Sequence, residues 1–411
     1  MIQKKECTKA DESSAFLFST SISLALYLLL FFGAPAIEEF YHTPNLGKVL
    51  RVSALVLMIN AVGIVPRSLL QRQLRFKELA VATTSISLFS GVVALFMAYN
   101  GYAYWALVGQ TLLAAGLMNM AYYFYTHWCP SIHFSAESFR LLFSFGLPMM
   151  FTSLVHAIYN NLYSLVIGKR FNAWQLGLYN RSDNYSSFIS YNLSDMSMRA
   201  LYPILSRAQD NYEQLKVAAL RILHASAFIV VPINIFLFVK AEDVICILLT
   251  DKWLEMAPLM RVMCVSTLAY VVSNLHFNLF KAIGRTQILF VCELIIKILG
   301  ILILLITFQY GLMAMVWGLL VYAALSILVS SLFVWYFMGI SLSEQCQQVY
   351  MVIINVVISI LACFLIGEFF DNIYLRLGLS FVVYFSVYGI LAWFERDKAI
   401  DFLMGYFKKE K

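Results

Sequence analysis

The chain is a succession of apolar blocks separated by short polar segments. Blocks of about 20 apolar residues cross the hydrocarbon core of a bilayer as α-helices. A transmembrane β-barrel would instead show alternating segments of about ten residues, whereas this chain contains long uncharged runs such as 312–338. The pattern predicts an all-α polytopic membrane protein with about twelve transmembrane helices, at residues 15–34, 50–66, 78–99, 103–124, 143–167, 184–204, 218–239, 257–280, 286–308, 312–337, 348–367 and 374–394.

Composition supports this prediction and excludes a water-soluble enzyme. Apolar residues make up 61% of the 411 and charged residues 13%, against about 45–50% and about 25% in soluble domains. The connections between spans are too short for a catalytic domain outside the membrane, and the phosphate loop, His-Glu-x-x-His and Gly-x-Ser-x-Gly motifs are absent. The seven cysteines contain no Cys-x-x-Cys pair, so we expect no metal site and no disulfide framework. The sequence predicts a protein that is not an enzyme and needs no cofactor.

Basic residues predict the orientation. With the N-terminus in the cytoplasm, 19 of the 29 Lys and Arg residues fall on the inside and nine on the outside, while Lys297 lies within a span. The positive-inside rule therefore places both termini in the cytoplasm. This asymmetry is more informative than the net charge of +6, which does not indicate a nucleic-acid partner. The basic turn at 67–77 is interpreted as a topogenic signal that faces anionic lipid.

The sequence also contains an internal repeat. At an offset of 210, three residues of the first half match identical residues at the same topological places: Arg51 with Arg261, Arg75 with Arg285, and Gly101 with Gly311. Such duplicated halves are common in transporters. Under this offset, the spans at 143–167 and 184–204 have no partner in the first half. We therefore expect either an asymmetric repeat or about 70 residues, carrying two helices, that are missing from the front.

Polar residues inside the predicted spans are candidates for function, because a charge at the bilayer centre costs about 2.5–3.5 kcal/mol on insertion scales. Steps of three and four residues, the spacing of one helix face, connect several of them: His156 with Asn160, Asn274 with Asn278, Glu293 with Lys297, and a stripe of Asn184, Phe188, Tyr191, Asp195 and Arg199 with Asn192 beside it. Each has a plainer interpretation. The Asn residues can be interhelical hydrogen-bond partners, the Glu293 and Lys297 charges can neutralise each other, His156 can be a core residue, and Arg199 can reach the membrane surface.

Short motifs in a fixed order resemble a known family. They stand at 2–5 (IQKK), 31–35 (FFGAP), 69–77 (LLQRQLRFK), 105–110 (WALVGQ), 145–148 (FGLP), 167–169 (IGK), 176–181 (LGLYNR), 202–207 (YPILSR), 251–253 (DKW), 282–285 (AIGR) and 293–297 (ELIIK). In combination they resemble the bacterial polysaccharide exporters and lipid-linked oligosaccharide flippases of the O-antigen type, in the superfamily that includes the MATE drug exporters.

The resemblance implies a fold of fourteen helices, in which two six-helix lobes face a central cavity and two helices follow. Three regions of this chain correspond to it: a truncated four-helix N-terminal lobe at 1–126, a six-helix lobe at 139–338, and two helices with a basic cytoplasmic tail at 339–411. In the family pattern the IQKK motif follows the second helix. The resemblance thus also implies a MATE-like two-lobe fold without its first two helices.

The implied function is flipping of undecaprenyl-pyrophosphate-linked oligosaccharide from the cytoplasmic to the periplasmic leaflet of the bacterial inner membrane by alternating access, for envelope polysaccharides such as lipopolysaccharide or capsule. The expected partners are this lipid-linked glycan, membrane lipid and other polysaccharide-assembly proteins. Candidate roles are pyrophosphate binding for Arg181, Arg199 and Lys297, sugar binding for Asn160, Asn184, Asn192, Asn274 and Asn278, and ion coupling for Asp183, Asp195 and Glu293. Alternatives are a MATE-like small-molecule exporter, a membrane glycan polymerase or ligase, and an inactive truncated paralogue.

Overall fold

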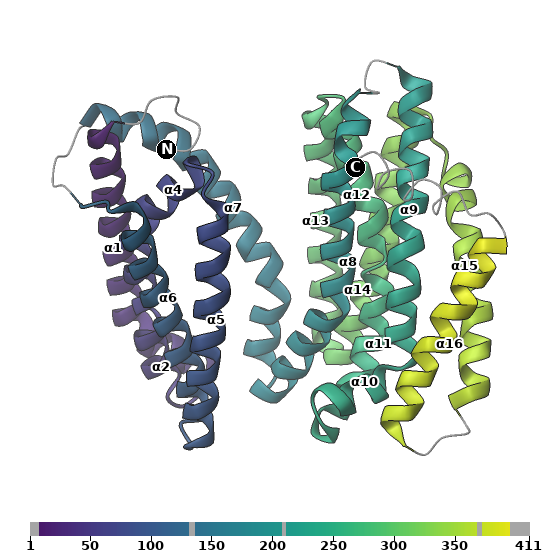
Figure 1. The fold of residues 1–411 in the computed structure, drawn as a ribbon, viewed down its shortest axis with the longest axis horizontal. Coiled ribbons are helices and arrows are strands. Elements are labelled where there is room, and N and C mark those ends of the chain that lie inside the picture. The colour runs from purple at the N-terminus through teal and green to yellow at the C-terminus, as the bar shows by residue number, and fades with distance from the viewer. Residues whose placement is uncertain (1–7, 131–135, 208–210, 368–371, 395–411) are drawn as a thin grey trace. The chain divides into compact units, whose positions relative to one another are not determined.

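The computed structural model describes residues 8–130, 136–207, 211–367 and 372–394, and within these ranges every regular element is a helix (Figure 1). Each of the twelve predicted spans falls on one helix or on a group of consecutive helices. By length and apolar composition, eight of the described helices are long enough to cross a membrane, or nine if one bent pair counts as a span. The all-α membrane fold predicted from the sequence is confirmed.

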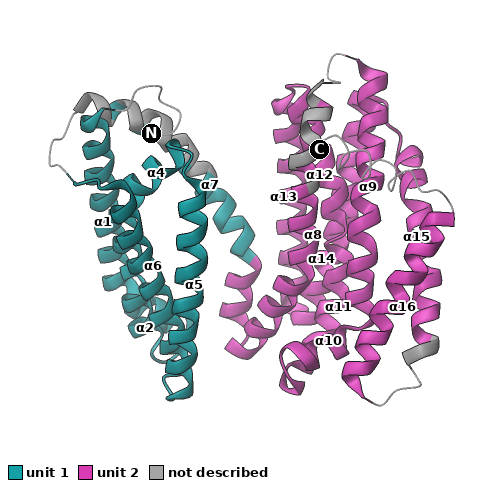
Figure 2. Ribbon diagram, viewed as in Figure 1, with its two compact units in different colours: residues 1–162 teal, residues 163–411 magenta. Residues whose placement is uncertain are grey.

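The first of two compact units contains residues 1–162 (Figure 2). Its elements are α1 (Lys9–Tyr41), the broken segment α2 (Leu46–Ser53), α3 (Leu55–Val62) and α4 (Ile64–Arg72), then α5 (Phe76–Tyr99), α6 (Tyr104–Thr126) and the start of α7 (Ala136–Arg170). Helix α1 packs against α2, α3 and α4, and α6 packs against α5 on one side and the broken segment on the other. The broken segment is thus the centre of unit 1.

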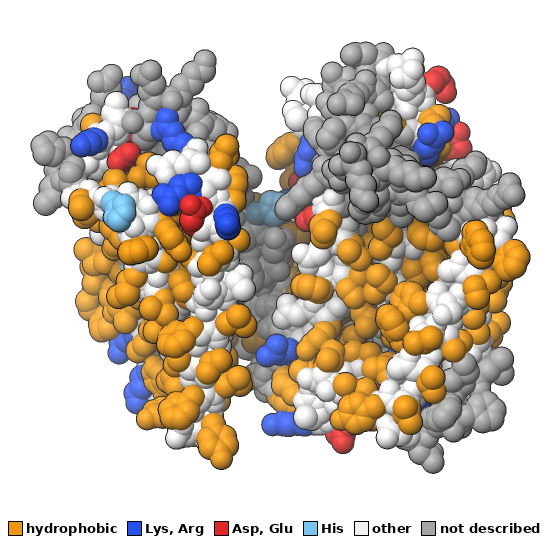
Figure 3. Space-filling model, in the orientation of Figure 1, with side chains coloured by type: hydrophobic (Ala, Val, Ile, Leu, Met, Phe, Trp, Pro, Cys, Tyr) orange, Lys and Arg blue, Asp and Glu red, His pale blue; other side chains and the backbone are white. Residues whose placement is uncertain are grey.

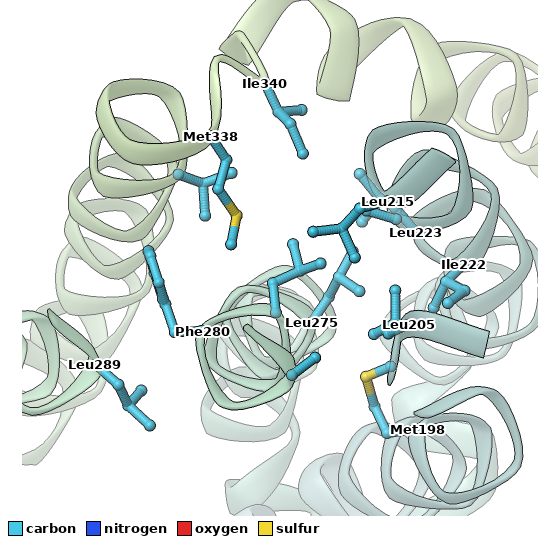
Figure 4. Packing of buried hydrophobic residues seen from close by; sticks show 14 residues of the cluster. Met198, Leu205, Leu215, Ile222, Leu223, Leu275, Phe280, Leu289, Met338 and Ile340 are labelled. Carbon is cyan, nitrogen blue, oxygen red and sulfur yellow. The ribbon is translucent and has the colours of Figure 1, made fainter. Parts of the chain in front are cut away.

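The second unit contains residues 163–411. After the end of α7 come α8 (Ala173–Arg207), α9 (Tyr212–Val239), α10 (Ala241–Leu248), η1 (Asp251–Met256), α11 (Ala257–Ser266), α12 (Ala269–Ala282), α13 (Thr286–Thr307), η2 (Phe308–Tyr310), α14 (Leu312–Met338), α15 (Leu342–Gly367) and α16 (Ile373–Phe394). Residues of α8, α9, α12, α13 and α14 share one hydrophobic core, which includes Leu205, Ile222, Phe280 and Met338 (Figure 4). This core holds α8 and α12 side by side.

The surface of both units is that of a membrane protein. Large apolar side chains such as Leu29, Phe32, Leu95 and Trp393 are exposed. Figure 3 shows hydrophobic side chains along the middle of the visible helices, and charged side chains toward helix ends. An apolar exposed surface of this extent fits lipid and not water.

The break between α3 and α4 has a specific cause at Gly63. The two helices meet there at 46°, and the Gly63 N–H donates to the carbonyl of Asn60 instead of continuing the regular pattern. The carbonyl of Ile59, which that N–H would otherwise bond, accepts from Asn119 Nδ2 of α6 at 2.6 Å. A Cβ at position 63 would lie 1.4 Å from Asn119 Oδ1. A side chain at position 63 would therefore displace the Asn119 amide that bonds the Ile59 carbonyl.

A proline interrupts α9 in unit 2, and a neighbouring helix compensates for it. Pro232 has no N–H, so the carbonyl of Phe228 four residues earlier has no partner within α9. The hydroxyl of Tyr388, on α16, donates to that carbonyl at 2.9 Å. One turn away on α16, Tyr384 donates to the carbonyl of Pro232 itself, also at 2.9 Å. Helix α16 is thus bonded to α9 at its proline, as expected where no water is available to satisfy a free carbonyl.

Unit 1 uses the same arrangement at two other prolines. Arg51 Nε donates at 2.9 Å to the Phe31 carbonyl that Pro35 leaves free in α1, and the Tyr123 hydroxyl donates at 3.0 Å to the Val62 carbonyl that Pro66 leaves free before α4. In each case the donor comes from another helix of the same unit. These polar side chains in the membrane stabilise backbone geometry.

The two halves also match in structure at the predicted offset. Helices α5 and α13 begin 210 residues apart. The residues before them, Arg75 and Arg285, have nearly the same backbone angles, with φ of −79° and −87° and ψ of 54° and 57°. Gly101 and Gly311 both have positive φ, at 84° and 102°, in the turns that follow these helices. The repeat predicted from the sequence is present in the backbone.

Candidate functional site

Helix α8 carries polar side chains on two faces with different surroundings. Small residues at steps of four, Ser182, Ser186, Ser190 and Ser194, are buried. Ser190 Oγ bonds Thr267 Oγ1 at 3.1 Å, next to the break between α11 and α12. Small residues of this kind let membrane helices approach closely, so this face packs within unit 2.

The other face of α8 carries larger polar and aromatic side chains. Asn184, Tyr191 and Asn192 are exposed, and Asp195 is half-buried beside them. Asn192 Nδ2 donates to the Phe188 carbonyl four residues earlier at 2.7 Å, which leaves its amide oxygen available. The described residues of the predicted stripe therefore lie along one face of α8, and Asn184, Phe188 and Tyr191 on that face are exposed.

Asp195 links this stripe to α12. One carboxylate oxygen, Oδ1, accepts from the Tyr270 hydroxyl at 2.9 Å and from Asn274 Nδ2 at 3.2 Å. Asn278 Nδ2 then donates to the Asn274 side-chain oxygen at 2.9 Å and to its backbone carbonyl at 2.8 Å. The result is a chain of hydrogen bonds that runs along α12 and ends at the carboxylate of α8.

Aromatic rings border the carboxylate. The rings of Tyr191 and Tyr270 lie 4.4 Å apart between centroids, inclined by 54°. Tyr191 is exposed and Tyr270 is half-buried. We name the residues of this cluster, Asn184, Tyr191, Asn192, Asp195, Tyr270, Asn274 and Asn278, the α8–α12 polar face.

The α8–α12 polar face suits a hydroxyl-rich ligand. It combines amide donors and acceptors with a carboxylate and an exposed aromatic ring, which are the groups that bond sugar hydroxyls and contact the apolar side of a sugar ring. Among the described residues no group of three or more His, Cys, Asp or Glu side chains has the arrangement of a metal site.

Other predicted residues belong to other helices. Glu293 and Lys297 form the predicted pair on α13, with Oε2 and Nζ 3.6 Å apart. Asn160 contacts His156 Nδ1 at 3.3 Å, as its spacing predicts, but both residues belong to unit 1.

The remaining predicted residues lie on α8 itself. Arg181 is exposed near its start, and Asp183 is half-buried. The side chain of Arg199 lies outside the described residues.

Tyr270 is a residue of the cluster that the sequence did not single out. It lies four residues before Asn274, as Asn274 lies four before Asn278. Extending that spacing by one step toward the N-terminus would have found it. Its hydroxyl makes the shorter of the two bonds to Asp195.

Known proteins match both the sequence and the fold. A family model described as polysaccharide biosynthesis protein matches residues 1–258. The teichuronic acid biosynthesis protein TuaB of Bacillus subtilis (strain 168) is 24% identical over 359 residues, which cover 85% of this chain and 73% of TuaB. The lipopolysaccharide biosynthesis protein WzxC of Escherichia coli (strain K12) is 24% identical over 297 residues, or 71% of this chain and 59% of WzxC.

Among solved structures, the lipid II flippase MurJ in its inward closed conformation matches with a TM-score of 0.78 at 17% sequence identity. The match covers 96% of this chain and 86% of MurJ. At this identity the likeness shows the fold. The family model covers more than half of the chain and includes the motifs from IQKK to DKW. The resemblance inferred from those motifs is therefore confirmed, and the chain belongs to the polysaccharide biosynthesis protein family.

Proposed function

We propose that this protein is a flippase that moves undecaprenyl-pyrophosphate-linked oligosaccharide from the cytoplasmic to the periplasmic leaflet of the bacterial inner membrane, with both termini in the cytoplasm. Family membership and the names of the relatives TuaB and WzxC support a place in envelope polysaccharide synthesis. The MurJ-like fold supports transport without an enzymatic step. In this proposal the regions 1–126 and 139–338 are the two lobes of an alternating-access transporter.

The observation that carries the proposal is the α8–α12 polar face. Exposed amides on a membrane helix are costly in contact with lipid, because hydrocarbon offers no hydrogen-bond partners. Asn184 and Asn192 avoid that cost if their face meets water or a polar ligand. A glycan supplies many hydroxyls for them, while its polyprenyl tail stays in lipid.

Each predicted residue has a role in this proposal. The positive side chains of Arg181, Arg199 and Lys297 would bind the pyrophosphate. Amides would bind sugar hydroxyls, namely those of Asn160, Asn184, Asn192, Asn274 and Asn278. The acidic side chains of Asp183, Asp195 and Glu293 would carry a coupling ion. Asp195 has the best support for its role, because its bonds from Tyr270 and Asn274 come from neutral donors and leave its second oxygen for a proton or ligand.

The test is a binding experiment with two probes that differ only in the sugar. Thermal stability of the purified chain is measured in detergent with undecaprenyl pyrophosphate, and with undecaprenyl pyrophosphate that carries a disaccharide. The disaccharide should raise the melting temperature further than the bare lipid. Asn192→Ala should remove most of that sugar-dependent difference, whereas Arg181→Gln should reduce the response to both probes.

The chain offers a matched control for Asn192. Asn100 is also exposed, and its Nδ2 also donates to the carbonyl four residues earlier at 2.7 Å, but it lies in the turn between α5 and α6. Asn100→Ala should therefore change neither response. Equal loss of the sugar-dependent shift in Asn192→Ala and Asn100→Ala, or no loss in either, would contradict the proposed sugar site.

A further inference from the structure

The turn between α4 and α5 has a counterpart with the same backbone in the second half. In the first half, the Leu74 N–H donates to the Gln71 carbonyl and the Arg75 N–H to the Leu70 carbonyl. In the second half, 210 residues later, Gly284 and Arg285 make the same two bonds to Lys281 and Phe280. Both turns are Schellman motifs, which end a helix with one residue in the left-handed region.

The residue at the left-handed position differs between the two turns. Gly284 has φ of 72° and accepts this conformation without strain, whereas Leu74 has φ of 56° and carries a branched side chain. A leucine in this region is strained by contact between its Cβ and the backbone. The Leu74 side chain gains no packing in return, because it is 73% exposed. Because packing does not explain this strained leucine, its side chain points to a role in binding.

The neighbours of Leu74 are also more apolar or more basic than their counterparts in the second half. Phe76 is 56% exposed and Lys77 is exposed, where the second half has Thr286 and Gln287. Arg67, one helix earlier, is also exposed. The first turn and the helix before it therefore present two apolar side chains and two positive charges at positions that differ in the second half, which has Lys281 exposed where the first half has Gln71.

Arg75, in the same turn, has a structural role. Its Nε lies 3.0 Å from Glu78 Oε1, and its Nη1 donates to the Tyr125 carbonyl at the end of α6 at 2.8 Å. It holds the turn against α6. Of the other basic residues at 67–77, Arg67 and Lys77 are exposed and Arg72 is half-buried.

We propose that this turn is an anchoring site for anionic phospholipid. It joins two segments that are apolar enough to span a membrane, so it lies where headgroups meet the acyl region. Leu74 and Phe76 enter the boundary of the acyl chains, and Arg67 and Lys77 pair with headgroup phosphates. Apolar side chains flanked by basic ones are the chemistry of interfacial lipid binding.

The test measures the melting temperature of the purified chain in detergent with added phosphatidylglycerol or phosphatidylcholine. Phosphatidylglycerol should stabilise the native chain more. Leu74→Gly should keep or raise the melting temperature in plain detergent, because it relieves strain, and should lose at least half of the shift specific to phosphatidylglycerol. Arg67→Gln with Lys77→Gln should weaken binding of phosphatidylglycerol about 25-fold, at about fivefold for each charge near the surface.

Two controls test whether the lipid shift is specific to this turn. Lys281→Gln, in the turn that has glycine, should leave the phosphatidylglycerol shift unchanged. Glycerol 3-phosphate should give no shift, because it lacks acyl chains. The proposal is overturned if Leu74→Gly lowers stability in detergent and keeps the full lipid shift, since Leu74 would then pack against protein. An equal effect of glycerol 3-phosphate would overturn it too.

Discussion

Replacing Tyr388 by phenylalanine removes one hydroxyl from α16 and leaves the ring in place. The carbonyl of Phe228 then loses its 2.9 Å bond, and Pro232 cannot supply a backbone replacement. Tyr388 is buried, so water does not readily reach the carbonyl. We therefore expect the loss of this one hydroxyl to lower the free energy of unfolding measurably.

The expected magnitude follows from the loss of one partner of a buried carbonyl. Leaving a buried acceptor unsatisfied costs about 1–3 kcal/mol, while interhelical hydrogen bonds in a membrane protein average about 0.6 kcal/mol in double-mutant cycles. Tyr388→Phe should therefore lower the free energy of unfolding by about 1–2 kcal/mol. Tyr384→Phe should cost less, about 0.5 kcal/mol, because within α9 the Pro232 carbonyl can also accept from the Phe236 N–H.

The assay is equilibrium unfolding in mixed micelles titrated with sodium dodecyl sulfate, followed by far-ultraviolet circular dichroism. A third variant isolates the cause. Pro232→Ala restores an N–H four residues after Phe228, so in that background Tyr388→Phe should cost less than about 0.5 kcal/mol. An equal cost of Tyr388→Phe with and without the proline would refute the reasoning, and so would a larger loss in Tyr384→Phe than in Tyr388→Phe.

Three further predictions concern other parts of the chain. Gly63→Ala should displace Asn119 from the Ile59 carbonyl and lower the free energy of unfolding by about 1–3 kcal/mol, measured in the same titration; a neutral effect would contradict the role given to the close approach. Arg376→Gln should lower the free energy of unfolding by about 1–3 kcal/mol, because it removes the guanidinium bonded to buried Asp243 on α10 and leaves that carboxylate with Lys240 at 4.0 Å, and a stability equal to that of the native chain would show that the pair is dispensable. A reporter enzyme fused after Lys411 should be active only in the cytoplasm, and a periplasmic signal would reverse the proposed orientation.

Much of the fold was predictable because its signals are local. Apolar length alone located every span on a helix. Residues four apart on one helix also met as expected: Glu293 and Lys297 form an ion pair, and Asn278 donates to Asn274. In these cases the helix itself fixes the distance, so no knowledge of neighbouring helices was needed.

The parts that the sequence did not predict depend on partners far along the chain. The bend at Gly63 is stabilised by Asn119. The hydrogen bond between Asp195 and Tyr270 joins residues that lie 75 positions apart in the sequence, on two different helices. Which face of α8 packs inward was also undetermined, because both of its faces are polar. The buried face carries serines such as Ser186, and their small size decides the packing.

The two halves differ in one further respect, at the arginine that begins the second span of each repeat. In the first half Arg51 bonds a carbonyl that Pro35 leaves free. In the second half the position that matches the proline is Ile245, and the matching Arg261 instead bonds the Glu242 carboxylate at 2.8 Å. The same arginine is thus a backbone cap beside a proline and an ion-pair partner without one. We therefore expect positions 35 and 51 to be coupled, so that the effect of a substitution at either depends on the residue at the other.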